Sequence, residues 1–202
     1  MNRISLADSP IVVGISGASG AVIAAKLIEA LIGNDVEVSL IASHASKIVW
    51  KQEMDQSFGE FLEQIMETGK VTNYNIGDTQ APIASGTYPI RGMVIVPCSM
   101  ATVAALAVGL ADNLLRRAAD VCFKERRPLT IIPRETPLSR LHLENLSKLA
   151  GMGANIIPPQ PAFYLKPRNL EDVINFLVQR VLLACGIIDG LPDDIRYNGP
   201  SK

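Results

Sequence analysis

A turn rich in glycine and serine, residues 14–20 (GISGASG), offers the clearest binding chemistry in the sequence. It lies between an apolar run typical of a strand and a segment with helical periodicity. Glycine lets the backbone turn tightly and approach a ligand, and the start of the following helix presents unpaired N–H groups to an anion. The serine hydroxyls add donors for phosphate oxygens. The pattern therefore indicates a phosphate-binding turn, with a plain strand-to-helix connection as the alternative.

The end of the second expected strand distinguishes two kinds of nucleotide. A dinucleotide-binding domain places an Asp or Glu there, about twenty residues after the turn, to bind the ribose hydroxyls. This chain has Ser43 at that place, after Ile41 and Ala42. A serine cannot accept hydrogen bonds from both hydroxyls but suits a phosphate, so the sequence favours a mononucleotide over NAD.

A second turn of small residues, 97–102 (PCSMAT), follows the expected central strand and opens another helix. Ser99 and Thr102 add hydroxyl groups to the free N–H groups of that helix. Because loops after neighbouring strands of a doubly wound sheet meet at one crevice, we expect both turns to face the same ligand. Capping of the two helices is the alternative explanation.

Cationic side chains that suit a second phosphate site gather later in the chain. With one tyrosine, they are Arg117, Lys124, Arg134, Tyr164 and Arg180. Each of these cations alone is more often an ion-paired surface residue. Two carboxylates, Glu53 and Glu135, are candidates for acid–base chemistry. His44 and His142 have no evident partners in the sequence and are interpreted as structural.

Short β-branched runs alternate with longer helical segments, which is typical of βαβ units around a parallel sheet. The expected strands are residues 11–15, 36–41, 71–76, 93–97, 129–133 and 154–157. The expected helices are residues 21–32, 45–51, 58–67, 101–108, 113–126, 137–149 and 169–185, with Thr136 as N-cap and Pro137 as first residue of the sixth. Residues 77–92 are predicted to be a functional loop. We expect one doubly wound α/β domain over residues 1–202, with an N-terminal extension (1–9) and a C-terminal tail (187–202).

Composition excludes several classes of protein. The chain has 202 residues, of which 48% are hydrophobic and 19% charged, so it is long and apolar enough for a folded core. Its net charge of −1 argues against a nucleic-acid partner. No run reaches the ~18 apolar residues of a membrane span, and no signal peptide is evident. Three widely spaced cysteines suit a reducing cytoplasm, and two histidines argue against a metal site. The mean hydropathy of +0.23 predicts apolar surface buried between subunits of a homo-oligomer.

A series of motifs then resembles one family over about residues 11–188. The motifs are GISGASGA (14–21), PIASG (82–86), VPCSMAT (96–102), RRAADVCFKERRPL (116–129), PRETPL (133–138), HLENL (142–146) and PPQPAFYLKP (158–167). In this order they resemble the UbiX-type flavin prenyltransferases. The resemblance implies a Rossmann-like, flavodoxin-related fold of three layers (αβα) with a mostly parallel sheet, assembled as a dodecamer. It also implies transfer of a dimethylallyl group, without a metal, from dimethylallyl monophosphate to N5 and C6 of reduced FMN. The product, prenylated FMN, serves UbiD-type decarboxylases.

The resemblance also assigns roles to individual residues. For FMN it implies Gly17, Ala18, Ser19, Ser43, Ser99, Met100, Ala101, Thr102, Arg117 and Arg134, with Ser85 and Gly86 contributed by a neighbouring subunit. For the dimethylallyl phosphate, in a pocket that spans a subunit interface, it implies Lys124, Tyr164 and Arg180. Glu53 and Glu135 match acidic residues that handle protons.

The tail departs from the family pattern. Members carry an Arg-Trp pair near the C-terminus, whose indole covers the prenyl pocket, whereas this chain has Arg196 followed by Tyr197. We expect Tyr197 to close the pocket less completely, with an uninvolved tail residue as the alternative. Two other functions stay open at this point, an FMN-dependent cysteine decarboxylase and a non-catalytic FMN carrier. The decarboxylases use a PASANT motif and a histidine, where this chain has PIASG and no suitable histidine.

Overall fold

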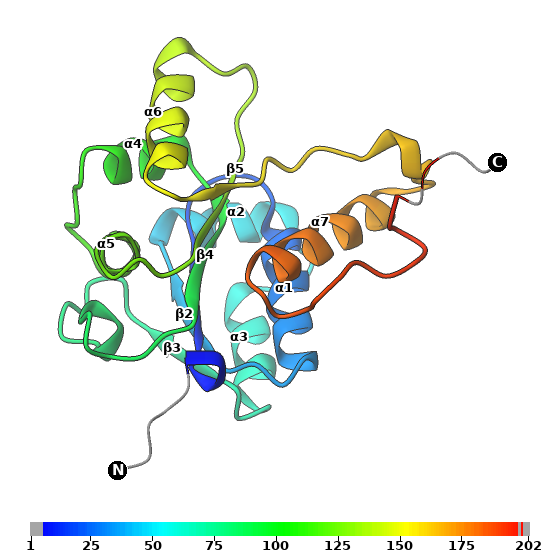
Figure 1. Cartoon of the computed structure of the whole chain (residues 1–202). Coiled ribbons are helices and arrows are strands. Elements are labelled where there is room, and N and C mark those ends of the chain that lie inside the picture. Colours follow the sequence, from blue (N-terminus) through cyan, green and yellow to red (C-terminus); the bar gives the residue numbers. More distant parts are fainter. Residues whose placement is uncertain (1–5, 198, 200–202) are drawn as a thin grey trace.

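One parallel sheet forms the centre of the molecule (Figure 1). The computed structural model describes residues 6–197 and 199, and in this part of the chain six strands lie in the order β3-β2-β1-β4-β5-β6. The strands are β1 (Ile11–Ile15), β2 (Val38–Ala42), β3 (Val71–Tyr74), β4 (Gly92–Cys98), β5 (Leu129–Pro133) and β6 (Asn155–Ile156). Every residue of β1, β2, β4 and β5 is buried, as expected for parallel strands covered on both faces.

Two layers of helices cover the two faces of the sheet (Figure 1). One layer consists of α1 (Ala21–Gly33), α2 (His44–Glu53), α3 (Phe58–Met66) and α7 (Leu170–Ala184), and the other of α4 (Met100–Ala107), α5 (Leu114–Lys124) and α6 (Arg140–Gly151). Successive strand side chains point to opposite faces, so Ile11 and Val13 pack in the first layer and Val12 in the second. This arrangement confirms the predicted three-layer αβα fold.

The strand order places a topological switch point between β1 and β4. From β1 the chain first adds β2 and β3 on one side, then crosses over to form β4 on the other side. Helices that follow β1 and β4 therefore leave in different directions, and a crevice opens at the carboxyl ends of these two strands. Residues 16–20 and Ser99, the two turns singled out from the sequence, lie at this crevice.

The start of the sixth helix differs from the sequence prediction. The expectation that Thr136 caps this helix and Pro137 begins it is wrong, because α6 begins at Arg140. Ser139 is the N-cap: its Oγ accepts a hydrogen bond from the His142 N–H, and His142 Nδ1 accepts one from the Ser139 N–H. The Thr136 hydroxyl instead donates to the carbonyl of Glu135. His142 thus has the structural role that was predicted for it.

Other boundaries move by a few residues. β2 begins at Val38 rather than at residue 36, and β6 is only two residues long. The predicted loop 77–92 contains one 3-10 turn, η2 (Pro82–Ala84), and its last residue already belongs to β4. A further turn, η1 (Leu6–Asp8), precedes β1, while residues 1–5 of the expected N-terminal extension lie outside the described chain.

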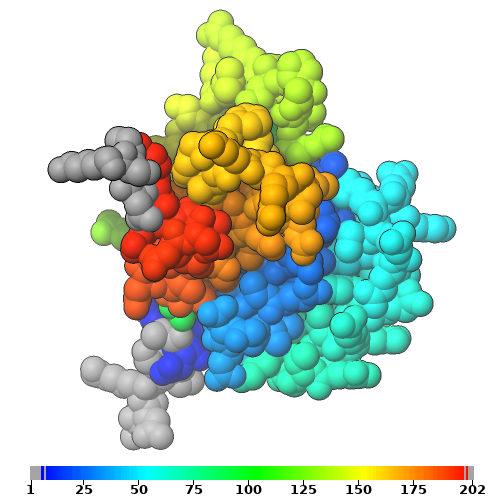
Figure 2. Space-filling view, turned by 90° about the vertical axis from the view of Figure 1, so that its right-hand side faces the viewer, coloured from blue at the N-terminus to red at the C-terminus, as the bar shows by residue number. Residues whose placement is uncertain are grey.

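The described part of the tail after α7 forms no helix or strand, as predicted, and it lies beside α7 and η3 (Phe163–Leu165) (Figure 2). Arg91, next to β4, donates a hydrogen bond to the carbonyl of Gly186 at the start of this tail. Residues 198 and 200–202 of the expected tail lie outside the described chain. Across the described residues, no helix is both long and apolar enough to cross a lipid bilayer.

Candidate active site

Ser16 joins the two turns at the switch point. Its Oγ donates a 2.9 Å hydrogen bond to the carbonyl of Pro97 and accepts one of 2.8 Å from the backbone N–H of Ser99. Ser16 is buried, so these bonds form away from water, where losing them is costly. The residues 14–20 turn and the residues 97–102 turn therefore face one crevice, as predicted. Sequence reasoning missed this role of Ser16, although a polar residue at the end of an apolar strand was the signal.

Gly17 brings the first turn against α2. A Cβ at residue 17 would lie 2.5 Å from the Cβ of Ala45, closer than real side chains approach each other. Gly17 and Ala45 both line a cavity of about 270 Å³. The other lining residues are Ser16, Ser43, Ile76, Ser99, Ala101, Thr102, Asn113, Leu115 and Arg116. We call this contact between Gly17 and Ala45 the Gly17 cradle. Only glycine lets the first turn approach α2 this closely.

Three helices begin at this cavity. Ser43, Ser99 and Asn113 are the N-caps of α2, α4 and α5, and each side-chain oxygen accepts from the backbone N–H three residues further on. The helix-capping alternative from the sequence is therefore correct for Ser99 in the second turn, whereas α1, which follows the first turn, has no side-chain cap. Each serine hydroxyl can still donate its own hydrogen to an anion, and the helix dipoles favour negative charge at the same place. The donor set fits the phosphate of a mononucleotide.

The start of α1 has a different partner from the one predicted. We expected its free N–H groups to bind the ligand anion, but the N–H groups of Gly20 and Ala21 donate to Oε2 of Glu53 at 2.9 and 2.8 Å. Burial alone would raise the pKa of Glu53. Hydrogen bonds from the Ser19 side chain and from these two N–H groups, with Arg134 nearby, outweigh burial and lower the pKa of Glu53 below its ordinary value. The start of α1 is therefore already occupied by a carboxylate of the protein itself.

Arg134 and Glu135 complete this part of the crevice. Arg134 follows β5 directly, and its backbone N–H donates to the carbonyl of Cys98 at the end of β4. Arg134 and Glu135 also line a second pocket of about 260 Å³, whose far wall is residues 158–160. The low pKa of Glu53 makes its carboxylate a weak base, because a general base works best with a pKa near the operating pH.

The predicted site residues on α5 and in the loop before β4 form a second group. Arg117 Nε donates to the carbonyl of Ala84 at 3.1 Å, and Arg117 Nη1 pairs with Asp120. Lys124 Nζ lies 2.6 Å from Oε1 of Glu125. A Cβ on Gly86 would lie only 2.5 Å from Lys124 Nζ. The loop of Ser85 and Gly86, predicted for the flavin, thus lies beside Lys124, predicted for the dimethylallyl phosphate. The sequence did not connect these two predicted sites.

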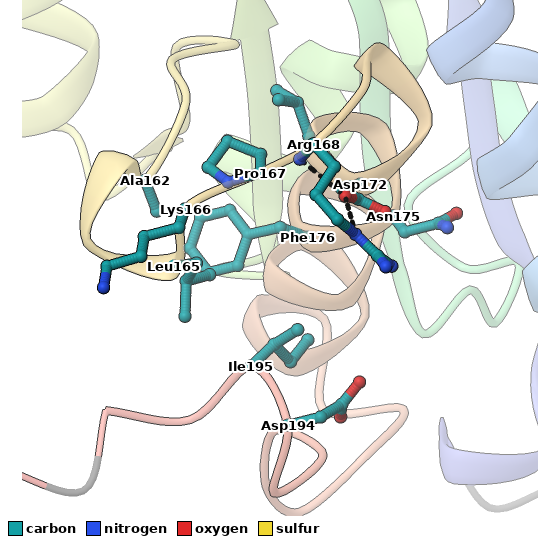
Figure 3. Close-up of a pocket in the computed structure, with 11 residues that line it drawn as sticks. Ala162, Leu165, Lys166, Pro167, Arg168, Asp172, Asn175, Phe176, Asp194 and Ile195 are labelled. Carbon is teal, nitrogen blue, oxygen red and sulfur yellow. Dashed lines mark hydrogen bonds and ion pairs between the residues drawn. The ribbon is translucent and has the colours of Figure 1, made fainter.

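A third group lies on the other face of the sheet. The rings of Tyr164 and Tyr197 meet edge to face, with centroids 5.6 Å apart. Next to them is a pocket of about 320 Å³ between η3, α7 and the tail, with Phe176, Leu165 and Ile195 in its wall (Figure 3). Arg168 and Asp172 form an ion pair at its edge (Figure 3). The side chain of Arg180 is exposed on α7.

Lys124, Tyr164 and Arg180, the residues predicted to bind the dimethylallyl phosphate, do not form one cluster within a single chain. Lys124 ends α5, which packs on one face of the sheet, whereas Arg180 lies on α7, which packs on the other. No hydrogen bond or ion pair joins any two of Lys124, Tyr164 and Arg180 within the described chain. The two cations therefore belong to helices on opposite faces of the sheet.

The cysteines take no part in this chemistry. Cys98, Cys122 and Cys185 are free and buried. Burial raises the pKa of Cys122 to about 12 and that of Cys185 to about 11, and it raises the pKa of Cys98 further. Their thiols stay protonated at neutral pH and behave as small buried hydrophobic groups.

Comparison with known proteins identifies the family. The family model described as Flavoprotein matches residues 3–182. The flavin prenyltransferase LpdB of Lactiplantibacillus plantarum is 51% identical over 190 residues, which cover 94% of this chain and 98% of that protein. The flavin prenyltransferase UbiX of a Synechocystis species is 46% identical over 183 residues, covering 86% of this chain and 89% of that one. The chain belongs to the UbiX-type flavin prenyltransferases.

Solved structures of UbiX-type proteins have the same fold. A dodecameric FMN-dependent UbiX-like decarboxylase from Escherichia coli O157:H7 has a TM-score of 0.86 at 38% identity and covers 94% of this chain and 100% of its own. AnUbiX (PadA1), solved with FMN and dimethylallyl pyrophosphate, has a TM-score of 0.86 at 39% identity and covers 96% and 99%. The UbiX-type family thus includes proteins that bind FMN and a prenyl phosphate and that assemble as dodecamers.

Proposed function

We propose that this chain joins the dimethylallyl group of dimethylallyl monophosphate to N5 and C6 of reduced FMN and so makes prenylated FMN. The observation that carries the proposal is the cavity at the starts of α2, α4 and α5, in a chain about half identical to a flavin prenyltransferase over nearly its whole length. The Gly17 cradle and the three N-caps supply the donors that an FMN phosphate requires. We further propose that a UbiD-type decarboxylase uses the product.

In this proposal the crevice residues hold the flavin. Ser43, Ser99 and Thr102 donate to its phosphate together with the backbone at Ser19, Met100 and Ala101, and Arg134 adds a positive charge. Ala18 lies beside the flavin without donating, because its N–H already donates to the carbonyl of Ser16. Reduced FMN, when bound, supplies the nucleophilic atoms that receive the dimethylallyl group. Glu53 keeps the first turn in place and carries a fixed negative charge beside Arg134.

The second part of the chemistry concerns the phosphate that leaves. Lys124, Tyr164 and Arg180 bind the phosphate of the donor, and their charges and hydroxyl group stabilise it as the allylic bond breaks. Holding donor and flavin together supplies the remaining rate enhancement through proximity. The carboxylate of Glu135, or the released phosphate, would accept the proton that leaves flavin C6, which balances the proton that the alkene of the dimethylallyl group gains for this second bond.

Assembly is part of the proposal. The separation of Lys124 from Arg180 on the two faces of the sheet supports a site between subunits, with Ser85 and Gly86 reaching the flavin of a neighbour. Exposed apolar side chains on α6 and beside it, among them Leu138, Leu141 and Leu143, provide surface for such contacts. We propose a homododecamer in the cytoplasm, a reducing compartment that suits three free thiols.

One assay tests the function. The purified chain is incubated anaerobically with reduced FMN and dimethylallyl monophosphate, and the flavin is analysed by mass spectrometry. We expect an FMN product that carries one dimethylallyl group. A flavin of unchanged mass, with FMN bound at about one per chain, would indicate an electron carrier and overturn the proposal. Repeating the assay with dimethylallyl diphosphate determines which donor the site accepts.

A further inference from the structure

The segment between β3 and β4 is anchored along α5, although it is mostly irregular. The N–H of Leu114, at the start of α5, donates to the carbonyl of Ile76 at 2.8 Å, and Arg117 holds the carbonyl of Ala84 in the first half of the helix. Ile83 and Ile90 are fully buried in the core beneath α5. The segment therefore follows the helix from its beginning to its end.

Arg127 makes the last of these attachments. Its Nη1 donates to the carbonyl of Tyr88 at 2.8 Å, and its Nη2 donates to the carbonyl of Gly86 at 2.7 Å. Charge-assisted hydrogen bonds are about twice as strong as neutral ones, and the rigid guanidinium fork suits two acceptors at once. The side chain is partly buried and reaches across 39 and 41 residues of sequence. The proposed function gives Arg127 no role of its own.

The two carbonyls belong to a short loop that contains proposed site residues. Gly86 is the residue where a Cβ would collide with Lys124 Nζ, so the loop backbone passes directly beside the lysine proposed to bind the donor phosphate. Ser85, the residue proposed to reach a neighbour's flavin, comes immediately before. The loop residues 85–88 are also closed on themselves, because Tyr88 N–H donates to the carbonyl of Ser85.

We propose that Arg127 is a positioning residue that fixes Ser85, Gly86 and Lys124 as one rigid unit. This inference rests on the proposed function, because it gives that unit the task of presenting a loop to the flavin and an ammonium group to the donor phosphate at once. Arg127 touches neither ligand. It holds the loop through the carbonyls of Gly86 and Tyr88, and its charge also acts on Glu125, the ion-pair partner of Lys124. Loss of the fork leaves those carbonyls without their charged donor and frees residues 84–91 to move relative to Lys124.

The test compares Arg127→Met with Arg126→Met in the full-length protein. Both variants remove one positive charge at the end of α5, but Arg126 is exposed. Hydrogen exchange measured by mass spectrometry is expected to be at least about tenfold faster in residues 84–91 of Arg127→Met, with unchanged exchange in β1 and β4. We also expect Arg127→Met to weaken FMN binding and to lower kcat for prenyl transfer, each by about tenfold. Arg126→Met is expected to match the parent.

The variant Arg127→Lys tests whether Arg127 acts through its two hydrogen bonds to the loop, which we call the Arg127 clamp, or only through its positive charge. A lysine keeps the charge but cannot span two carbonyls with a rigid fork, so we expect intermediate exchange rates and partial recovery of kcat. Equal behaviour of Arg127→Met and Arg126→Met, or of Arg127→Lys and the parent, would overturn the proposal, and the lysine variant decides the matter if Arg127→Met does not fold. A parent protein without prenyl transfer would overturn the proposed function instead. The exchange rates and FMN affinities of the variants would then still test whether Arg127 holds the loop in place.

Discussion

Glu53 Oε2 accepts the backbone N–H of Gly20 at 2.9 Å, across 33 residues of sequence. The carboxylate thus occupies the positive end of the α1 dipole, a place where a Rossmann-like fold often holds the phosphate of its ligand. The N-caps of α2, α4 and α5, which are Ser43, Ser99 and Asn113, line the cavity instead. The protein's own side chain therefore fills the start of α1, and we propose that FMN binds at the helix starts that line the cavity.

Replacing Glu53 by Gln tests this relationship through pH. The folded-state pKa of Glu53 lies below its ordinary value of 4.5, so its stabilisation is fully present above that value and is lost as the pH falls through the lowered pKa. We expect Glu53→Gln to reduce the free energy of unfolding at pH 7 by about 0.3–1 kcal/mol at low salt. The difference from the parent should close below pH 4.5, as measured by urea unfolding.

A matched control is Glu63→Gln on the exposed side of α3, which changes the charge equally without a helix start beside it. It should leave stability at pH 7 nearly unchanged. A Glu53→Gln deficit that persisted undiminished at the lowest pH at which both proteins fold would show that the ionised carboxylate is not the stabilising species.

Gly17→Ala should damage the cradle. The new Cβ would lie 2.5 Å from Ala45 Cβ, so the first turn or α2 has to move, at a cost of about 1–3 kcal/mol in stability. FMN affinity should fall as well, because the same two residues line the cavity. Gly33→Ala is the control, since a Cβ there meets no atom within 4 Å. Thermal unfolding and FMN titration of both variants check the prediction, and equal affinities would contradict it.

The fold was largely predictable because local signals and burial agree. The apolar run of β1 and the Asn169 cap of α7, whose side chain accepts from Asp172 N–H, gave the same result in sequence and structure. The start of α6 was not, because Thr136-Pro137 and Ser139 are competing start signals, and only Ser139 finds its partner in His142. Sequence patterns cannot rank two such caps without the packing around them.

The site was less predictable, because its decisive contacts are long-range. The family resemblance implies that Gly86 contacts a neighbouring subunit's flavin, and within one chain the structure places it beside the ion pair of Lys124 and Glu125. Similarly, the sequence indicated that the start of α1 was open, whereas a carboxylate from the end of α2 fills it. The types of these residues were informative, but their partners depend on how helices pack over the sheet.

Lys124→Ala and Arg180→Ala should each abolish most prenyl transfer. Each variant removes one charge from the departing phosphate, and we expect kcat to fall by about 100-fold or more while FMN remains bound. Because the two residues lie on opposite faces of the sheet, they are expected to reach one pocket from different subunits. Dissociating and reassembling the two inactive variants together should therefore restore part of the activity, through pockets with both residues intact. Failure of the mixed oligomer to regain any activity would place both residues in the same chain's pocket.

The last prediction concerns Tyr197, which replaces the tryptophan of the family pattern. Its ring meets Tyr164 edge to face, which supports a role at the prenyl pocket over that of an uninvolved tail residue. A phenol ring presents a weaker negative face to an allylic cation than an indole does, and Tyr197 is 67% exposed, so the contribution should be modest. We expect Tyr197→Ala to slow prenyl transfer about two- to fivefold, which corresponds to about 0.5–1 kcal/mol, and Tyr197→Trp to preserve or raise the rate. FMN affinity, measured in parallel, should stay constant in both variants. Rates equal to the parent in both would remove the tail from catalysis.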